Sequence, residues 1–216
     1  MPNAAQRRLR YRADTRRAIL DAAEELLVEG GPDAFSMRRL AERCGCTAPT
    51  LYHYFRDKPG LIVELLEERL QGLARELRAV KPSRDPLQTV CALGTAFARF
   101  GLRNPGHYQL LVAPRGDDTP DPPSTEEVQR LFLDPLEELV RRGDLAEGEL
   151  ERLRQGLWCL LHGFILLQST HPDHAWEPAL LDASLDAMIR GSLRPAPPRA
   201  PALRTRAPRA GSRSRK

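Results

Sequence analysis

Apolar residues recur at helical spacing along most of the chain. The clearest example follows the i, i+3, i+4, i+7 pattern, at Ile19, Ala22, Ala23, Leu26 and Leu27. This spacing places them on one face of an amphipathic helix, and Gly30-Gly31 is typical of its end. Runs of alternating β-branched or aromatic residues and the turn signals of hairpins are absent from the sequence. The pattern therefore predicts an all-helical (all-α) fold.

Cap residues mark the helices that follow. Ser36, Thr47 and Asp57 have side chains that accept hydrogen bonds from first-turn amides, so each predicts a helix that begins directly after it. The helix after Ser36 is short and is expected over 37–43. The helix after Asp57 is long and is expected over 58–80.

The proline-rich break at 81–86 predicts a domain boundary. Beyond it, helical spacing predicts helices near 86–103, 105–113, 124–142, 147–169 and 177–193. A loop is expected over 114–123. We therefore divide the chain into a flexible basic N-terminal arm (1–14), a three-helix unit (15–60) continued by a linking helix (58–80), a helical domain (81–194) and a disordered Arg/Pro/Ala-rich tail (195–216).

Charge is distributed unevenly along the chain. The whole sequence has 33 Lys and Arg against 29 Asp and Glu, a net charge of +4. Residues 1–17 hold six arginines and one acid (+5), and residues 191–216 hold eight basic residues and no acid (+8). The segment between them therefore carries −9, which is +4 less +5 and +8. Basic ends of this kind favour polyanions such as nucleic acid or a membrane surface, or they are simply solvated.

Composition and motifs exclude several classes of protein. The most apolar stretch, 156–167, is too short to span a bilayer, and the first thirty residues lack the apolar core of a secretory signal. We therefore expect a cytoplasmic protein without membrane contact. Four cysteines are too few for a disulfide framework, and the Cys44-Gly45-Cys46 pair has no second pair or nearby histidine, so we expect no metal site and no cofactor. Nucleotide-binding glycine loops and nucleophile elbows are absent, so we expect no enzyme.

Residues 36–55 carry the pattern that is most informative about function. Two short helices joined by a turn at Gly45 are typical of a helix-turn-helix unit. With Leu40 and Ala41 buried on the first helix, and Leu51 and Phe55 on the second, the outward face contains hydroxyl groups and aromatic rings but no carboxylate. This face consists of Thr47, Ala48, Pro49, Thr50, Tyr52, His53 and Tyr54. Such a face suits a polyanionic groove, and first-turn amides favour phosphate, so the segment predicts binding to double-stranded DNA.

Thr15–Leu70 closely resembles the DNA-binding domain of the tetracycline-repressor (TetR) family, above all in the sequence LYHYFRDK at 51–58. The resemblance implies an all-α fold in which three N-terminal helices form a helix-turn-helix DNA-binding domain. A linking helix follows, and a C-terminal helical bundle binds a ligand and forms the dimer.

The resemblance also assigns roles to individual residues of this unit. It implies a recognition helix at the major groove that includes Thr47, Pro49, Thr50, Tyr52 and His53, of which Tyr52 and His53 match positions that touch phosphate. It implies further phosphate contacts from Ser36, Arg38 and Lys58. Pro59-Gly60 departs from the helix-favouring residues that are usual in the family, so we expect a looser start to the linking helix.

The C-terminal half resembles one subgroup of the family's ligand-binding domains, in Trp158, His162 and Gly163 and in the segment 103–111. The resemblance implies a pocket for a small, mostly apolar effector. Its boundary would include Phe97, Phe100, Tyr108, Leu111, Phe132, Trp158, His162 and Phe164. The alternative is that these residues are ordinary core.

Three functions are consistent with these patterns. The first is a ligand-responsive repressor that binds a palindromic operator as a homodimer, because a single helix-turn-helix reads only a few base pairs. The helices near 147–169 and 177–193 are then expected to form the interface between subunits. The second is a sequence-tolerant DNA-binding or architectural protein driven by its Arg-rich termini. The third is a helical-bundle enzyme whose basic ends are incidental.

Overall fold

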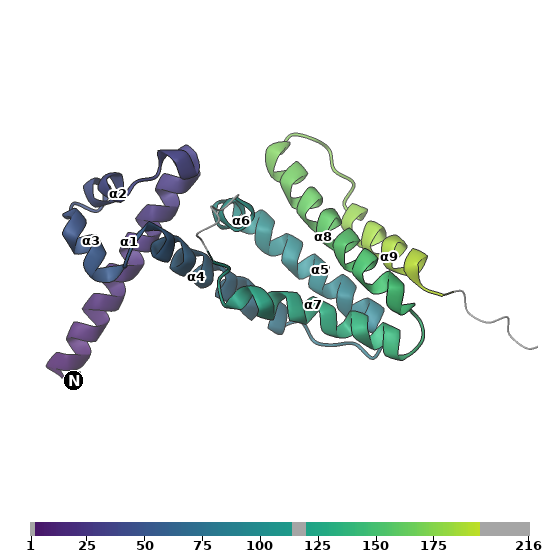
Figure 1. Ribbon diagram of the computed structural model, residues 1–216. Coiled ribbons are helices and arrows are strands. Elements are labelled where there is room, and N and C mark those ends of the chain that lie inside the picture. Colours follow the sequence, from purple (N-terminus) through teal and green to yellow (C-terminus); the bar gives the residue numbers. More distant parts are fainter. Residues whose placement is uncertain (1–2, 114–119, 195–216) are drawn as a thin grey trace, which may run out of the picture.

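The computed structural model describes residues 3–113 and 120–194, apart from the side chains of residues 32–34, and this part of the chain forms nine helices (Figure 1). They are α1 (Ala4–Ala34), α2 (Met37–Arg43), α3 (Ala48–Tyr54), α4 (Lys58–Arg78), α5 (Pro86–Arg103), α6 (Pro105–Val112), α7 (Ser124–Arg141), α8 (Glu147–Thr170) and α9 (Leu180–Ser192). Within these residues the only β-type pairing is an isolated bridge between Leu145 and Leu193. The all-α prediction is confirmed, and the bounds predicted for α2 and for α4 to α9 lie within three residues of those observed.

Two of the three predicted helix caps form as expected. The side chain of Ser36 accepts a hydrogen bond from the amide of Arg39 at 3.3 Å, and Asp57 Oδ1 accepts one from the amide of Gly60 at 2.7 Å. Thr47 makes no such bond with its side chain; its hydroxyl lies 2.9 Å from the hydroxyl of Thr50 instead. The first-turn amides of α3 therefore have no side-chain cap. Uncapped amides of this kind can donate hydrogen bonds to an anion at a helix N-terminus.

The N-terminal arm differs from its prediction. Residues 1–14 are expected to be flexible, but α1 already begins at Ala4. Asn3 and Gln6 form a reciprocal capping box: the amide of Gln6 donates to Asn3 Oδ1 at 2.8 Å, and the amide of Asn3 donates to Gln6 Oε1 at 3.0 Å. Ala, Gln, Leu and Arg are good helix formers, so a capped start extends α1 without tertiary support. Near its other end, regular helix is interrupted at Gly31, whose φ of 71° favours glycine.

The N-terminal core joins α1, α2, α3 and the first half of α4. Leu40, Ala41, Leu51 and Phe55 are buried in it, as the sequence predicts. Leu110 of α6 also belongs to this core, so α6 packs against the N-terminal helices. The second half of α4 packs elsewhere: Leu73 and Leu77 lie with Phe100 in a cluster shared with α5.

The C-terminal bundle forms around α5 and α8. Its core contains side chains from α5 to α9, among them Val90, Leu136, Leu161, Ile165 and Leu185. Figure 1 shows α8 and α9 on the side of this bundle farthest from α3. In the part of the chain that the structure describes, no helix is both long and apolar enough to cross a membrane. Most of the predicted loop, 114–119, and the predicted tail, 195–216, lie outside the described residues.

Candidate nucleic-acid interface and effector site

The helix-turn-helix is built from α2, α3 and the turn between them. In this turn Gly45 has a φ of 62°, and the amide of Cys46 donates to the carbonyl of Ala41 at 2.9 Å. Leu51 and Phe55 are buried beneath α3, which turns the opposite side of this short helix toward solvent. The sequence therefore sets both the sharp turn and the face that α3 presents.

The predicted DNA contacts fall into two groups by exposure. Six side chains are exposed, namely Arg38, Thr47, Pro49, Thr50, Tyr52 and His53, and four are half-buried, namely Ser36, Ala48, Tyr54 and Lys58. Seven of the ten lie on α3 or its N-cap, so the structure brings most of the predicted set onto one short helix. This surface contains hydroxyl, aromatic and imidazole groups and no carboxylate, which is the chemistry that a groove of DNA accommodates.

Lys58 lies at the edge of this surface and has a structural contact that sequence reasoning missed. Its ammonium group donates to the carbonyl oxygen of Phe35 at 3.0 Å and lies 5.3 Å from the centre of the Phe35 ring. This contact ties the first residue of α4 to the segment between α1 and α2. Lys58 therefore stabilises the packing of the three-helix unit, in addition to the phosphate contact that the resemblance implies.

Arginines of α1 lie beside α3 and are a second feature that sequence reasoning did not place there. The guanidinium of Arg12 lies 6.0 Å from the ring centre of Tyr54, and that of Arg16 lies 4.8 Å from the ring centre of Phe55. Arg16 also forms an ion pair with Glu64 of α4. The apolar pattern that predicts a helix here begins only at Ile19, so it assigns no position to Arg12 and Arg16.

An aromatic cluster lies in the C-terminal bundle, where four helices meet. The hydroxyl of Tyr108 on α6 lies 2.8 Å from Nδ1 of His162 on α8. The His162 ring is 5.3 Å from that of Phe97 on α5 and 5.7 Å from that of Trp158, and Phe97 contacts Phe132 on α7 at 6.1 Å. The structure therefore brings together five of the eight residues that were predicted to bound an effector pocket.

The polar pair at the centre of this cluster is uncharged near neutral pH. Burial raises the pKa of Tyr108 to about 12 and lowers the pKa of His162 below its usual value. A neutral phenol beside a neutral imidazole offers both a donor and an acceptor among aromatic rings. This arrangement suits a ligand that is mostly apolar and has one hydrogen-bonding group.

The other three predicted pocket residues lie apart from these ring contacts. Phe100 is buried against the second half of α4, and its ring is 6.5 Å from that of His107. Leu111 packs beside the same cluster and beside the N-terminal core. Phe164 is half-buried at the edge of the C-terminal core.

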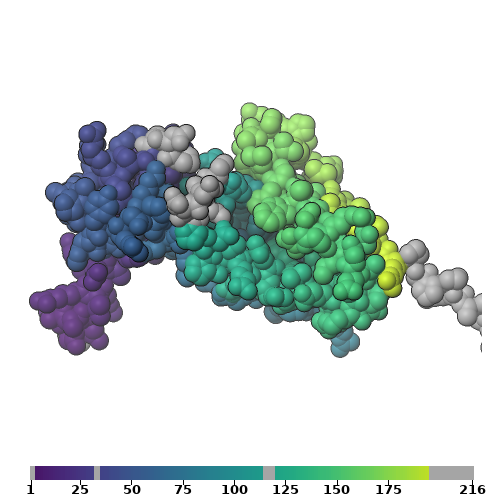
Figure 2. All heavy atoms as spheres, viewed as in Figure 1, coloured from purple at the N-terminus to yellow at the C-terminus, as the bar shows by residue number. Residues whose placement is uncertain are grey.

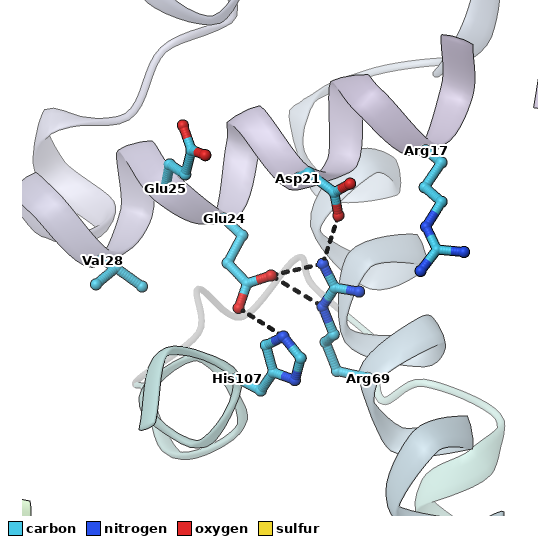
Figure 3. A pocket seen from close by; sticks show the side chains of 7 residues that line it. All are labelled: Arg17, Asp21, Glu24, Glu25, Val28, Arg69 and His107. Carbon is cyan, nitrogen blue, oxygen red and sulfur yellow. Dashed lines mark hydrogen bonds and ion pairs between the residues drawn. The ribbon is translucent and has the colours of Figure 1, made fainter. Parts of the chain in front are cut away.

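A charged cavity of about 420 Å³ lies where α1, α4 and α6 meet (Figure 3). The guanidinium of Arg69, only 8% exposed, is held between Glu24 Oε2, at 2.5 Å, and Asp21 Oδ1, at 2.9 Å. The other oxygen of Glu24 lies 3.2 Å from Nε2 of His107. Burial lowers the pKa of His107, although the charge of Glu24 opposes this shift. Sequence reasoning missed this cluster, which connects the DNA-binding helices to the first short helix of the C-terminal bundle.

Comparison with known proteins decides the family. Residues 19–65 match the profile "Bacterial regulatory proteins, tetR family", and residues 90–191 match "Tetracyclin repressor-like, C-terminal domain". The chain belongs to the TetR family. It is therefore a helix-turn-helix DNA-binding transcriptional regulator, and because the family is not enzymatic, the enzyme alternative is excluded.

Several curated TetR-type regulators are similar in sequence. YobS, an uncharacterized HTH-type transcriptional regulator of Bacillus subtilis, is 26% identical over 71% of this chain and 78% of its own length. The HTH-type repressor KstR of Rhodococcus jostii is 34% identical over 43% of each chain. The HTH-type activator FasR of Mycolicibacterium smegmatis is 31% identical over 46% of each chain. This chain thus spans less than half the length of the latter two relatives, one a repressor and one an activator.

Solved structures of TetR proteins share the fold. A TetR family transcription regulator from Marinobacter aquaeolei has a TM-score of 0.69 at 16% identity, over 85% of this chain and 98% of its own. A TetR protein from Acinetobacter baumannii, solved in complex with minocycline, has a TM-score of 0.55 at 20% identity, over 80% of this chain and 93% of its own. At these identities the likeness concerns the arrangement of helices.

Proposed function

We propose that this TetR protein is a ligand-responsive repressor that binds a palindromic operator as a homodimer and is released by a small, mostly apolar effector. The observation that carries the proposal is the exposed, carboxylate-free surface of α3 on a complete helix-turn-helix. In this proposal Thr47, Pro49 and Thr50 contact bases at the start of α3. Tyr52 and His53 contact phosphates, as do Ser36 and Arg38 at the start of α2, and these contacts position the helix without reading sequence.

Apolar side chains exposed on α8 and α9 support the homodimer. Trp158 is 52% exposed and Leu166 is 53% exposed, and Leu167 and Leu180 are also accessible. Around α8, Gly163 lies about 60° from Leu166 and about 40° from Leu167 at 100° per residue, and a Cβ atom added there would meet nothing within 4 Å. A helix face that combines large apolar side chains with a bare glycine favours close packing against a second helix. We therefore place the interface between subunits on α8 and α9.

The aromatic cluster supports the class of effector. Phe97, Phe132 and Trp158 supply apolar surface, and Tyr108 and His162 supply a neutral hydrogen-bonding pair. The proposal includes the subgroup that the sequence resembles, and the Trp158, His162 and Gly163 pattern supports it.

Two adjacent residues of α6 supply the route from effector to DNA. Tyr108 lies in the aromatic cluster, whereas His107 contacts Glu24 of α1, which in turn holds Arg69 of α4. A ligand that displaces Tyr108 would therefore also shift the side chain that touches the DNA-binding helices. Effector binding would favour conformers in which the two recognition helices of the dimer are wrongly spaced for successive major grooves, so operator affinity would fall.

Selection of bound fragments from genomic DNA with the full chain tests the proposal. We expect one palindromic sequence to be enriched and to bind roughly 10³-fold or more tightly than a random duplex. Thr50→Ala should change which sequences are selected, whereas Thr170→Ala, on an exposed threonine of α8, should not. Equal affinity for all duplexes would overturn the proposal and favour the sequence-tolerant alternative.

A further inference from the structure

The first turns of α1 have arginines without acidic partners. Arg7, Arg8, Arg10 and Arg12 are exposed, and among the residues the structure describes none of the four lies within ion-pair distance of a carboxylate. The next arginines of the same helix differ, because Arg16 pairs with Glu64 and Arg17 approaches Glu68 at 4.0 Å. The uncompensated positive charge is therefore confined to the part of α1 before residue 13.

These arginines are held on a formed helix. The capping box between Asn3 and Gln6 starts α1, and Thr15 donates to the carbonyl of Tyr11 at 2.9 Å within it. Arg8 and Arg12 are four residues apart and lie on one face, where like charges oppose helix formation. A polyanion placed along this face would relieve the repulsion.

This face is directed toward the recognition helix. Arg12 lies 6.0 Å from the ring centre of Tyr54, the last residue of α3. Figures 1 and 2 show the N-terminal turns of α1 extending beyond α3, away from the body of the molecule. Residues 4–14 extend about 16 Å along the axis, at 1.5 Å per residue, and the major groove of DNA is about 12 Å wide. A duplex contacted by α3 would therefore reach the side of α1 that holds Arg8 and Arg12.

We propose that Arg8 and Arg12 form a second contact with the operator, on phosphates that flank the major-groove segment contacted by α3. The proposal rests on the proposed function, in which α3 contacts that groove. Guanidinium groups bind phosphate oxygens in a bidentate way, and neither arginine has to leave a carboxylate first. Arg10 lies about 160° around the helix from Arg8, at 100° per residue, so it faces away from this duplex.

A matched pair of double variants tests the proposal. Arg8→Ala/Arg12→Ala and Arg7→Ala/Arg10→Ala remove the same charge from the same exposed turns, and both keep the helix because alanine is the best helix former. Each is compared with wild type by fluorescence anisotropy between 50 and 300 mM salt (roughly the range in which phosphate contacts dominate affinity), on the selected operator with long flanks. We expect the slope of log affinity against log salt to fall by about two per subunit for the first variant and by far less for the second.

The outcomes separate this inference from the proposed function. If the first variant keeps the wild-type slope, or if both variants lose equal slope, Arg8 and Arg12 make no directed contact and the proposal is overturned. If wild type shows no preference for any duplex, the proposed function fails, yet the same slopes measured on random duplex still decide whether this face binds phosphate. Circular dichroism of the variants checks that α1 remains helical.

Discussion

The imidazole of His162 and the phenol of Tyr108 are both kept neutral by burial, and stability should therefore depend on pH at this pair. The pKa of His162 is lower in the folded protein than the usual 6.5, so the unfolded chain takes up a proton first as pH falls. The contribution of His162 is complete above about pH 6.5 and is lost as pH falls through its folded pKa. For Tyr108, raised to about 12, the contribution is complete below about pH 10 and is lost above it.

We expect His162→Gln to reduce the loss of stability on the acid side. Urea unfolding between about pH 7.5 and 5 (a range that brackets the ordinary histidine pKa) should show a smaller fall in the free energy of unfolding for the variant than for wild type. Replacement of the exposed His171 by Gln, at the end of α8, serves as the control and should keep the wild-type dependence. Equal dependence in wild type and His162→Gln would show that this imidazole is not the group responsible.

Single residues also show where the sequence is informative. The inward positions Leu51 and Phe55 and the outward positions Thr50 and Tyr52 follow from helical spacing, which depends only on local chain geometry. The contact of Lys58 with the carbonyl of Phe35 joins positions 23 residues apart, and no local pattern contains it. The resemblance suggested a phosphate contact for Lys58, and that role stays a prediction beside the contact observed.

At the scale of helices, the ion pairs of Arg69 join α1 to α4 and should contribute to stability. Arg69 is 8% exposed and Glu24 is 13% exposed, so removal of the carboxylate leaves a nearly buried charge. Asp21, the other partner, is 51% exposed, and solvent screens its interaction. We expect Glu24→Ala to lower the free energy of unfolding by about 3 kcal/mol and Asp21→Ala to lower it by less than about 1 kcal/mol.

Urea denaturation of the two variants measures the difference, and Asp21→Ala is the matched control because it removes a carboxylate from the same guanidinium. A double-mutant cycle of Glu24→Leu with Arg69→Met then isolates the coupling between the two side chains. If Glu24→Ala lowers the free energy of unfolding only as much as Asp21→Ala does, the Glu24–Arg69 pair contributes no more than a surface ion pair. The proposed route from effector to DNA through α6 would then lack a strong contact between α1 and α4.

Helix bounds were well predicted because caps and prolines act locally, but contacts between helices were not. Charged and polar side chains on a surface helix usually face solvent. The sequence alone therefore predicts exposure for the four residues of this cluster, namely Asp21, Glu24, Arg69 and His107. Only the meeting of α1, α4 and α6 brings these positions into one network around the buried guanidinium of Arg69. The arm over 1–14 was predicted to be flexible, whereas the capping box of Asn3 and Gln6 starts α1 there.

Across the whole molecule, α4 belongs to two hydrophobic clusters, the N-terminal core and the cluster that it shares with α5. Its first half packs with the DNA-binding helices and its second half with α5, and Glu67 accepts hydrogen bonds from the amide of Ser124, at 2.8 Å, and from its hydroxyl, at 2.7 Å. The N-terminus of α7 is thereby fixed to α4. A movement in the C-terminal bundle would consequently reach α4 through α5, α6 and α7 together, which supports the proposed role of α4 as the link between effector and DNA.

The proposed dimer gives the last prediction, at Gly163. Within one subunit a Cβ atom added at this position meets nothing within 4 Å, and leucine favours helix more than glycine does, so Gly163→Leu should leave the subunit at least as stable as wild type. Across a close α8 interface the same leucine would hold the two helices apart. We therefore expect light scattering after gel filtration to give the 24.3 kDa mass of a single chain for Gly163→Leu and twice that mass for wild type.

Gly148→Leu is the matched control for this prediction. A Cβ atom at Gly148 also meets nothing within 4 Å, but this glycine lies in the first turn of α8, about 22 Å along the axis from Gly163 at 1.5 Å per residue. It should remain dimeric and keep its operator affinity, whereas Gly163→Leu should lose affinity because one helix-turn-helix contacts only half of a palindrome. A Gly163→Leu protein that stays dimeric would place the interface away from this face of α8, and the exposed Trp158 and Leu166 would then need another partner.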